Sequence, residues 1–120
     1  MAQTVTPAVL VPRFTTFVGE QSFFTLPIDV SAFQKGYISV WHGDMLGTNT
    51  PKTLFNFLES TDRVIWSSIS GASAIDPGPG IEEQVEFDIS KRWLQLSVEL
   101  KGTNPATTCW VAGYFRNREE

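Results

Sequence analysis

The segment EFDISKRWLQLSVELKGTNPATTCWVAGYF, residues 86–115, decides the fold. Every second residue from 94 to 100 is Leu or Val, and the residues between them are polar. This period of two is that of a strand with one buried face. Turn-forming residues 102–105, Gly-Thr-Asn-Pro, interrupt the run, and residues 107–115 form a second, more apolar run. The segment therefore predicts a long antiparallel pair of strands connected at residues 102–105.

The remainder of the chain follows the same plan of short apolar or alternating runs separated by Gly, Pro and Asn. No stretch carries an apolar stripe with the helical period of 3.6 residues. The sequence predicts further strands over residues 14–18, 22–28, 37–41, 52–59, 64–69 and 81–89, with a hairpin joining 52–59 to 64–69. Residues 71–80, GASAIDPGPG, predict an exposed and mobile loop. We therefore expect an all-β, antiparallel fold, a sandwich or a small barrel.

Two parts of the chain resemble each other in order. Residues 28–31, 37–40 and 47–49 match residues 87–90, 93–96 and 102–104 in residue type. Two similar halves favour a jelly-roll-like β-sandwich of two Greek keys. An immunoglobulin-like sandwich is an alternative, as is independent use of the same turn residues between alternating strands.

A chain of 120 residues corresponds to one domain with a single core. We expect the β-sandwich over residues 14–116, an extended N-terminal arm over 1–13 and a solvated C-terminal tail over 117–120. The arm contains Pro7 and Pro12, which favour an extended chain. Its apolar residues 9–11 are costly to leave in water, so the arm is expected to dock on a neighbouring subunit. A frayed terminus is the alternative.

Charge and composition exclude several classes of partner. The net charge is −4, and the nine basic residues are scattered, which does not suit a nucleic-acid phosphate backbone. No window approaches the roughly 20 apolar residues that span a bilayer. The N-terminus lacks the basic and apolar regions of a signal peptide, so we expect assembly in a cytoplasm. One cysteine excludes an internal disulfide.

The sequence shows no set of residues typical of catalysis. His42 is the single histidine, so a multi-histidine metal site is excluded. A nucleophilic pair would need Cys109 to meet His42, but Cys109 lies within a predicted strand, where a small buried thiol is the ordinary interpretation. No phosphate-binding or serine-nucleophile motif occurs. We expect no enzymatic activity and no cofactor.

The acidic residues also lack a catalytic pattern. Glu82, Glu86 and Asp88 alternate along one strand and predict a solvated face rather than two carboxylates facing each other across a cleft. Asp44, Asp62 and Asp76 lie in loops and could bind a lone calcium ion, although they lack EF-hand spacing. We expect no metal site.

The aromatic content, 12%, is high for a small core. Trp93 is out of phase with the apolar residues of its strand and is predicted to point outward. Aromatic anchors dominate protein–protein contacts, so we expect an interface that uses Trp93 and the N-terminal arm. The residues predicted for this interface are Val9, Leu10, Val11, Phe14, Trp41 and Trp93. The alternative is that exposed tryptophans stack on sugar rings, as in carbohydrate-binding modules.

The short sequence segments at these strands and turns together resemble those of the β-sandwich decoration or cement proteins of tailed-bacteriophage capsids. The resemblance covers residues 28–116 and rests on DVS at 29–31 before YISV, ESTD at 59–62 before VIW, DIS at 88–90 before WLQL, and GTNP at 102–105 before Trp110. It implies a non-enzymatic virion protein that binds the major capsid protein or neighbouring subunits. A homo-oligomer, with a trimer favoured, is implied as well. A tail or baseplate component is the alternative.

Overall fold

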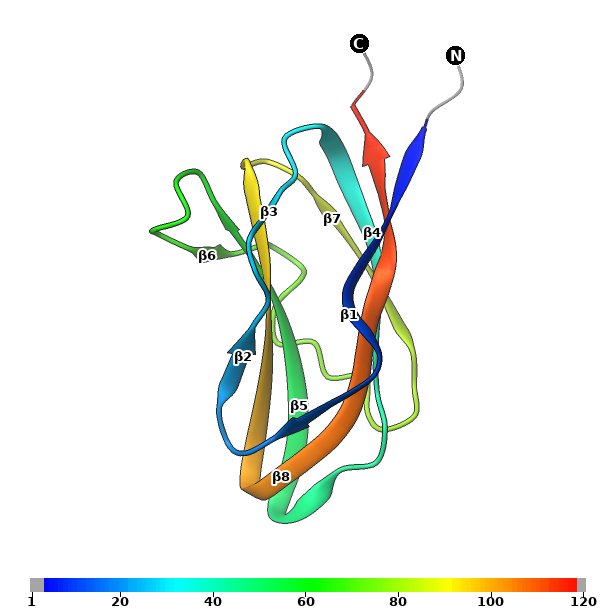
Figure 1. Cartoon of the computed structure of the whole chain (residues 1–120), viewed down its shortest axis with the longest axis vertical. Helices are drawn as coiled ribbons and strands as arrows, with labels where there is room; N and C mark the ends of the chain where they lie inside the picture. Colours follow the sequence, from blue (N-terminus) through cyan, green and yellow to red (C-terminus); the bar gives the residue numbers. More distant parts are fainter. Residues whose placement is uncertain (1–3, 119–120) are drawn as a thin grey trace.

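The computed structural model describes residues 4–118, in which every regular element is a β-strand (Figure 1). The prediction of an all-β, antiparallel fold is confirmed. Within this described part there is no helix long and apolar enough to cross a membrane. The strands are β1 (Val5–Val18), β2 (Ser22–Phe24), β3 (Ile28–Asp29), β4 (Phe33–His42), β5 (Leu46–Ser60), β6 (Ser67–Ser68), β7 (Glu83–Asp88) and β8 (Trp93–Asn117).

The strand β8 is the central strand of the sheet, and its 25 residues run through the predicted turn. Its first part, 93–101, pairs with β5 along one edge and with β2 and β3 along the other. Its second part, 106–117, pairs with β4 and β1. The prediction that these two parts pair with each other is wrong. Gly102 (φ +114°) and Asn104 (φ +50°) bend the strand instead of reversing it.

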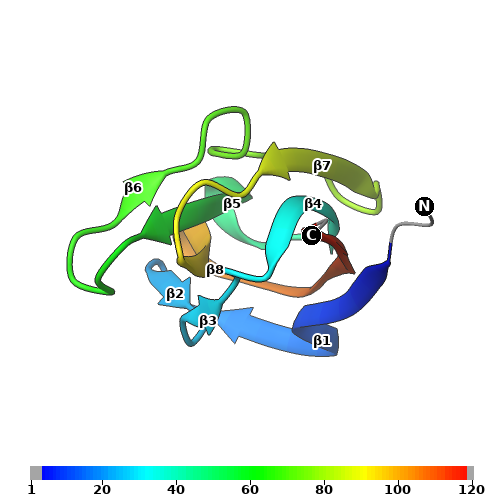
Figure 2. The same ribbon diagram turned by 90° about the horizontal axis from the view of Figure 1, so that it is seen from above.

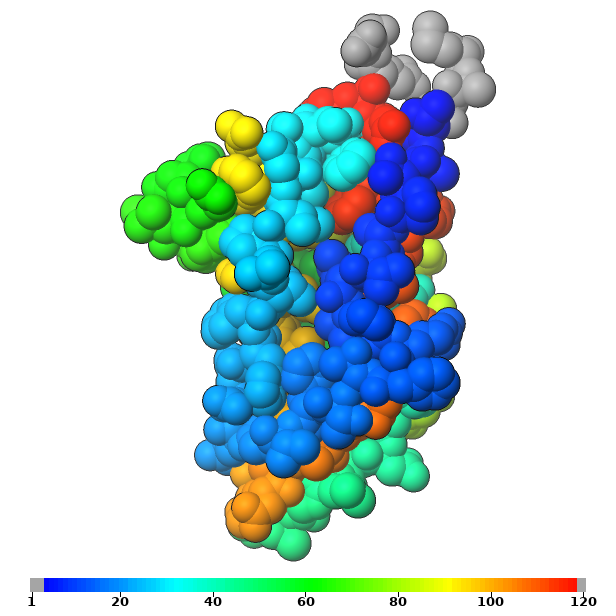
Figure 3. All heavy atoms as spheres, in the orientation of Figure 1, coloured from blue at the N-terminus to red at the C-terminus, as the bar shows by residue number. Residues whose placement is uncertain are grey.

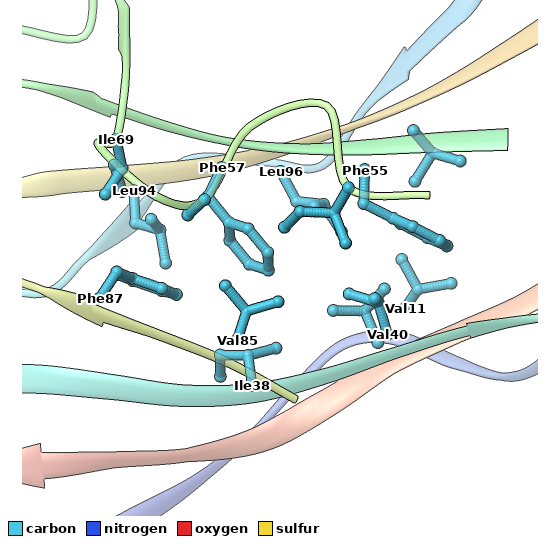
Figure 4. Packing of buried hydrophobic residues seen from close by; sticks show 14 of the residues in the cluster. Val11, Ile38, Val40, Phe55, Phe57, Ile69, Val85, Phe87, Leu94 and Leu96 are labelled. Carbon is cyan, nitrogen blue, oxygen red and sulfur yellow. The ribbon is translucent and has the colours of Figure 1, made fainter. Parts of the chain in front are cut away.

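The eight strands form one sheet in the order β6-β5-β8-β4-β7, with β1, β2 and β3 along β8. The bend in β8 curls this sheet so that its two halves face each other (Figure 2). Phe55, Phe57 and Leu96 from the β5–β8 half point towards Ile38 and Val40 from the β4 half (Figure 4). These side chains are almost completely buried and form the centre of the core.

The internal similarity of the sequence has a structural counterpart. Thr48 pairs with Thr103, so the two Gly-Thr-Asn segments lie against each other where β5 and β8 bend. Both glycines have a left-handed φ, +117° at Gly47 and +114° at Gly102. A Cβ atom on Gly47 would lie 2.7 Å from the carbonyl oxygen of Thr103. The two similar parts of the chain also exchange strands. The strand β3 of the first part pairs with β8 of the second, and β7 of the second part pairs with β4 of the first.

The N-terminal segment is part of the sheet. Residues 5–13, predicted as an arm that docks on a neighbour, form the first part of β1 and pair with β8 of the same chain. The register shifts between Val11 and Thr15, where Phe14 has a φ of +67°, so an irregularity lies at the predicted boundary. At the C-terminus, the N–H of Arg118 donates to the carbonyl oxygen of Ala32. Residues 1–3 and 119–120, parts of the predicted arm and tail, lie outside the described residues.

The loop over residues 71–80 is tied to β5 rather than free. Phe57 N–H donates to the carbonyl oxygen of Ala72, and the backbone groups of Phe55 and Ile75 bond in both directions at 2.9 Å. Ala72 and Ile75 are buried. The prediction of an exposed loop is therefore wrong at these two residues, which complete the edge of the core, whereas residues 71, 73 and 74 are exposed. The predicted strand over 64–69 is reduced to the two residues of β6, which pair with β5 as the expected hairpin.

Candidate functional site

The outer face of β4 and β8 carries two stacked aromatic pairs. Along β4, Ile38 and Val40 point into the core, so the alternation of the strand places Tyr37 and Trp41 outside. Tyr37 is directly opposite Tyr114, with ring centroids 5.0 Å apart, and Trp41 is opposite Trp110, with centroids 6.3 Å apart. We call these four residues the aromatic ladder.

The irregular stretch of β1 brings a cation and another ring to the end of this ladder. The guanidinium carbon of Arg13 lies 4.4 Å from the centre of the Trp110 ring, within the range of a cation–π contact. The neighbouring Phe14 is 88% exposed. A surface hollow of about 440 Å³ opens here, which we call the tryptophan hollow. It is lined by Arg13, Phe14, Trp41, Gly80, Glu82, Thr108 and Trp110.

The surroundings of the aromatic ladder are apolar on one side and charged on the other. On the β1 side, Val9 is paired with Ala112 and is 65% exposed. On the β7 side, Glu86 is opposite Tyr37 and Asp88 is opposite Lys35, whose ammonium nitrogen lies 5.6 Å from the Tyr37 ring centre. The face therefore combines rings that can be desolvated on contact with a border in which Glu86 and Asp88 lie beside Lys35.

The structure brings only part of the predicted interface together. Val9, Phe14 and Trp41 lie on the half of the sheet that carries the aromatic ladder. Leu10 is half-buried against the core, and Val11 is 3% exposed and belongs to the core, so its side chain is not at the surface. Trp93 lies on the other half, opposite Ser60.

Trp93 is also covered rather than free. The guanidinium carbons of Arg63 and Arg92 lie 4.4 Å and 5.1 Å from its ring centre. Arg92 is held in turn by an ion pair with Asp29, at 3.1 Å. Ser97, one of the polar residues that alternate with Leu and Val along the same strand, is buried. Trp93 is therefore better placed to support the neighbouring loop than to anchor a partner.

Sequence reasoning did not single out Arg13, Tyr37 or Tyr114, and it did not count Trp110 among the interface residues. The alternation that buries Ile38 and Val40 could have placed Tyr37 beside Trp41. The pairing of each with its partner in β8 depends on the register, which the sequence does not specify. Arg13 reaches Trp110 because β1 is irregular, and no local pattern in the sequence signals that irregularity.

The two residues that could have formed a nucleophilic pair do meet. His42 and Cys109 are paired across β4 and β8, and both are buried. The Nδ1–H of His42 donates to the carbonyl oxygen of Gly43 at 2.8 Å. Burial raises the pKa of the Cys109 thiol to about 12, so the thiol stays protonated near neutral pH. A thiolate is the nucleophile in cysteine catalysis, and this environment opposes its formation.

We predict that Cys109 resists labelling in the folded chain. At pH 8 an aromatic disulfide reagent should modify less than about a tenth of the folded protein while it modifies the urea-unfolded chain completely. The folded-state pKa is raised, so the folded state keeps its proton above the ordinary pKa of 9.0, and stability should fall as pH rises from about 9 to about 12. Fast labelling of the folded chain would contradict this burial.

The loop carboxylates have local partners. The Asp62 carboxylate accepts hydrogen bonds from the backbone N–H groups of Val64 and Ile65, at 2.9 and 3.0 Å. These bonds, followed by the one from Ser60, lower the pKa of Asp62. Asp76 accepts from the N–H of Gly78. Within residues 4–118, no three His, Cys, Asp or Glu side chains are grouped so that they could hold a metal ion.

Comparisons with known proteins give a similar fold but no family. No family model matches the chain, and no curated protein matches it in sequence. The crystal structure of the SPBc2 prophage-derived protein YomS is similar, with a TM-score of 0.51 over 93% of this chain and 95% of that chain. The two sequences are 14% identical. The chain thus has the overall fold of a prophage-derived protein.

Proposed function

We propose that this chain is a non-enzymatic structural subunit of a bacteriophage particle that acts by contact, as a decoration or cement protein on the capsid surface. The observation that carries the proposal is the outward-facing aromatic ladder with Arg13 and Phe14 at its end. Tyr114 is exposed and Tyr37 and Trp41 are half-buried, whereas Trp110 is only 9% exposed. The similarity to YomS supports a phage context. The partners we propose are the major capsid protein or neighbouring virion subunits, with no cofactor.

The composition of this face supports binding to protein. Trp, Tyr and Arg are the residues most enriched among those that dominate binding energy. Phe14 and Val9 expose apolar surface, and its burial stabilises a complex by roughly 25 cal/mol per Å². Glu86, Asp88 and Lys35 give this border charges of both signs, which favours a partner whose rim carries the complementary charges. Covering this face would favour the assembled particle over its separated parts.

The position of β1 favours contact through side chains over contact through its backbone. Among the described residues β1 pairs with β8 alone, which leaves its other edge open. Pro7 and Pro12 supply no N–H group, and the irregularity at Phe14 interrupts the strand. Prolines and bulges weaken the addition of another strand to an edge. We therefore place the contribution of the N-terminal segment in its exposed side chains, Val9 above all.

Binding to particles assembled without the chain tests the proposal. Wild-type protein should co-sediment with such particles, and the double variant Phe14→Ala, Trp41→Ala should bind at least about tenfold more weakly because it loses two aromatic contacts of this face. Leu26→Ala is the matched control, since Leu26 is 85% exposed and lies outside the face. If the double variant binds like wild type, the aromatic face is not the contact surface.

The tryptophan hollow supports a second candidate function, the binding of a sugar. Trp41 and Trp110 supply aromatic surface there, while Arg13 and Glu82 could bond hydroxyl groups. Soluble glycans should then change tryptophan fluorescence in wild type and not in Trp41→Ala. A response to glycans without binding to particles would favour this function over the structural one.

We also infer that the curled sheet derives from a jelly-roll-like sandwich of two Greek keys. The support is the exchange of equivalent strands between the two similar parts of the chain. A subunit with this fold could belong to the head, to the tail or to the baseplate, and the same face would serve in each. Location in the virion and a homo-oligomeric state, with a trimer favoured, are parts of this proposal.

A further inference from the structure

The loop between β5 and β6 carries a projecting apolar tip. It extends from the body of the molecule on the side away from β1 (Figures 1 and 3). Val64 is 77% exposed and Ile65 is 76% exposed, so two adjacent β-branched side chains lie in water. We call these two residues the apolar tip.

The loop is organised to hold the apolar tip in one arrangement. Asp62 accepts bonds from the N–H groups of both tip residues, and Ser60 Oγ donates to the same carboxylate oxygen at 3.0 Å. The N–H of Arg63 donates to Ser60 Oγ at 2.9 Å, while the Arg63 guanidinium lies over Trp93. A loop that is already ordered loses less conformational entropy on binding.

A second feature, which we call the apolar hollow, lies between β1 and β2. Its volume is about 130 Å³, or about four water molecules at ~30 Å³ each, which is room for the four-carbon side chain of one isoleucine. Phe24, at its rim, is 59% exposed. The lining is mostly apolar and consists of Leu10, Val11, Pro12, Thr15, Phe17, Phe23, Phe24, Thr25 and Val98.

We propose that the apolar tip of one copy inserts into the apolar hollow of a second copy of this chain. The two features match in polarity, and the hollow has room for the Ile65 side chain. The tip follows β5, which pairs with one edge of β8, whereas β2 at the hollow pairs with the other edge, so the tip and the hollow are different surfaces of the chain. When each copy engages a new neighbour in the same sense, repeated copies form a ring or a filament.

The size of this contact predicts how tightly copies associate. Two side chains cover far less than the roughly 1,200 Å² of a specific stable interface. The contact is therefore weak between free copies and gains strength when a particle holds many copies side by side, which raises their effective concentration. This inference rests on the proposed function, which supplies the particle that holds many copies together. The contact itself can be tested without particles.

Disulfide trapping between single-cysteine variants tests the proposal. Ile65→Cys and Phe24→Cys are mixed in equal amounts and oxidised, and Cys109, which is fully buried, should contribute little background. The mixed disulfide should form at least tenfold more than between Ile65→Cys and Leu46→Cys, a control at an exposed position outside the hollow. Equal yields, or a predominance of Ile65→Cys paired with itself, would overturn the insertion of the tip into the hollow.

A further variant in this experiment tests whether the ordering of the loop contributes to the contact. Asp62→Asn, added to Ile65→Cys, weakens the bonds to the tip without changing the tip residues, and should lower the mixed-disulfide yield severalfold. An unchanged yield would show that ordering by Asp62 plays no part in the contact. Because trapping uses free protein, the two proposals can fail separately. A positive trapping result together with no binding to particles would contradict the proposed function and support this contact.

Discussion

Replacing Phe57 by Ala should lower the free energy of unfolding by about 3–5 kcal/mol, the usual cost of removing a buried phenylalanine ring. Phe57 is completely buried, and its ring centroid lies 4.9 Å from that of Phe87 on the other half of the sheet. The ring thus joins the two facing halves of the core (Figure 4). Its removal leaves a cavity and takes away contacts that the surrounding strands cannot replace by small shifts.

Urea denaturation followed by tryptophan fluorescence measures this loss, with Phe14→Ala as the matched control. Phe14 is 88% exposed, so its truncation should change the free energy of unfolding by less than about 0.5 kcal/mol. The slope of free energy against urea should be similar in both variants, which shows that the denatured state is unchanged. A cost below about 1 kcal/mol for Phe57→Ala would contradict the packing of the two halves described here.

Gly113→Ala should be comparably severe, costing more than about 3 kcal/mol or preventing folding altogether. Gly113 is paired with Ile38 of β4 and with Ala8 of β1, so it lies in the middle of three strands. A Cβ atom there would overlap the carbonyl oxygen of Tyr37 and lie 2.8 Å from the Ile38 Cα atom. These are backbone atoms of a paired strand, so they cannot move aside as the end of a flexible side chain could.

Gly43→Ala is the control for this prediction. A Cβ atom on Gly43 would first meet the edge of the Trp41 ring, at 3.3 Å, which can yield by a small rotation. We expect a change within about 1 kcal/mol in the same denaturation experiment. Similar stability of Gly113→Ala and Gly43→Ala would mean that β4 and β8 do not approach as closely as the structure places them.

The sequence predicts the strands of this protein better than their connections. The alternation at residues 94–100 places Leu94 and Leu96 in the core, as observed, because side chains on a strand alternate between its faces. The residues at 102–105 have the chemistry of a turn, but a glycine with positive φ serves a bend in a continuous strand equally well. Tertiary pairing with β5 at Thr48 decides between these outcomes.

In the candidate site, too, the sequence pattern predicts which way a strand residue faces but not its tertiary contacts. A single strand pattern can indicate that Trp41 faces outward, but the partner of its ring is set by the register of β4 against β8. Trp93 is also out of phase with its apolar neighbours, yet Arg63 and Arg92 cover it. The phase of a residue along a strand does not specify which loop lies over it, and loops are placed by contacts distant in sequence.

The most direct test of the central claim, that this chain is a structural part of a phage particle, is its copy number in purified particles made by the genome that encodes it. Quantitative mass spectrometry of density-banded particles should find a fixed number of copies relative to the major capsid protein, unchanged by further washing. A chain that is abundant in the lysate and absent from the banded particles would contradict the account.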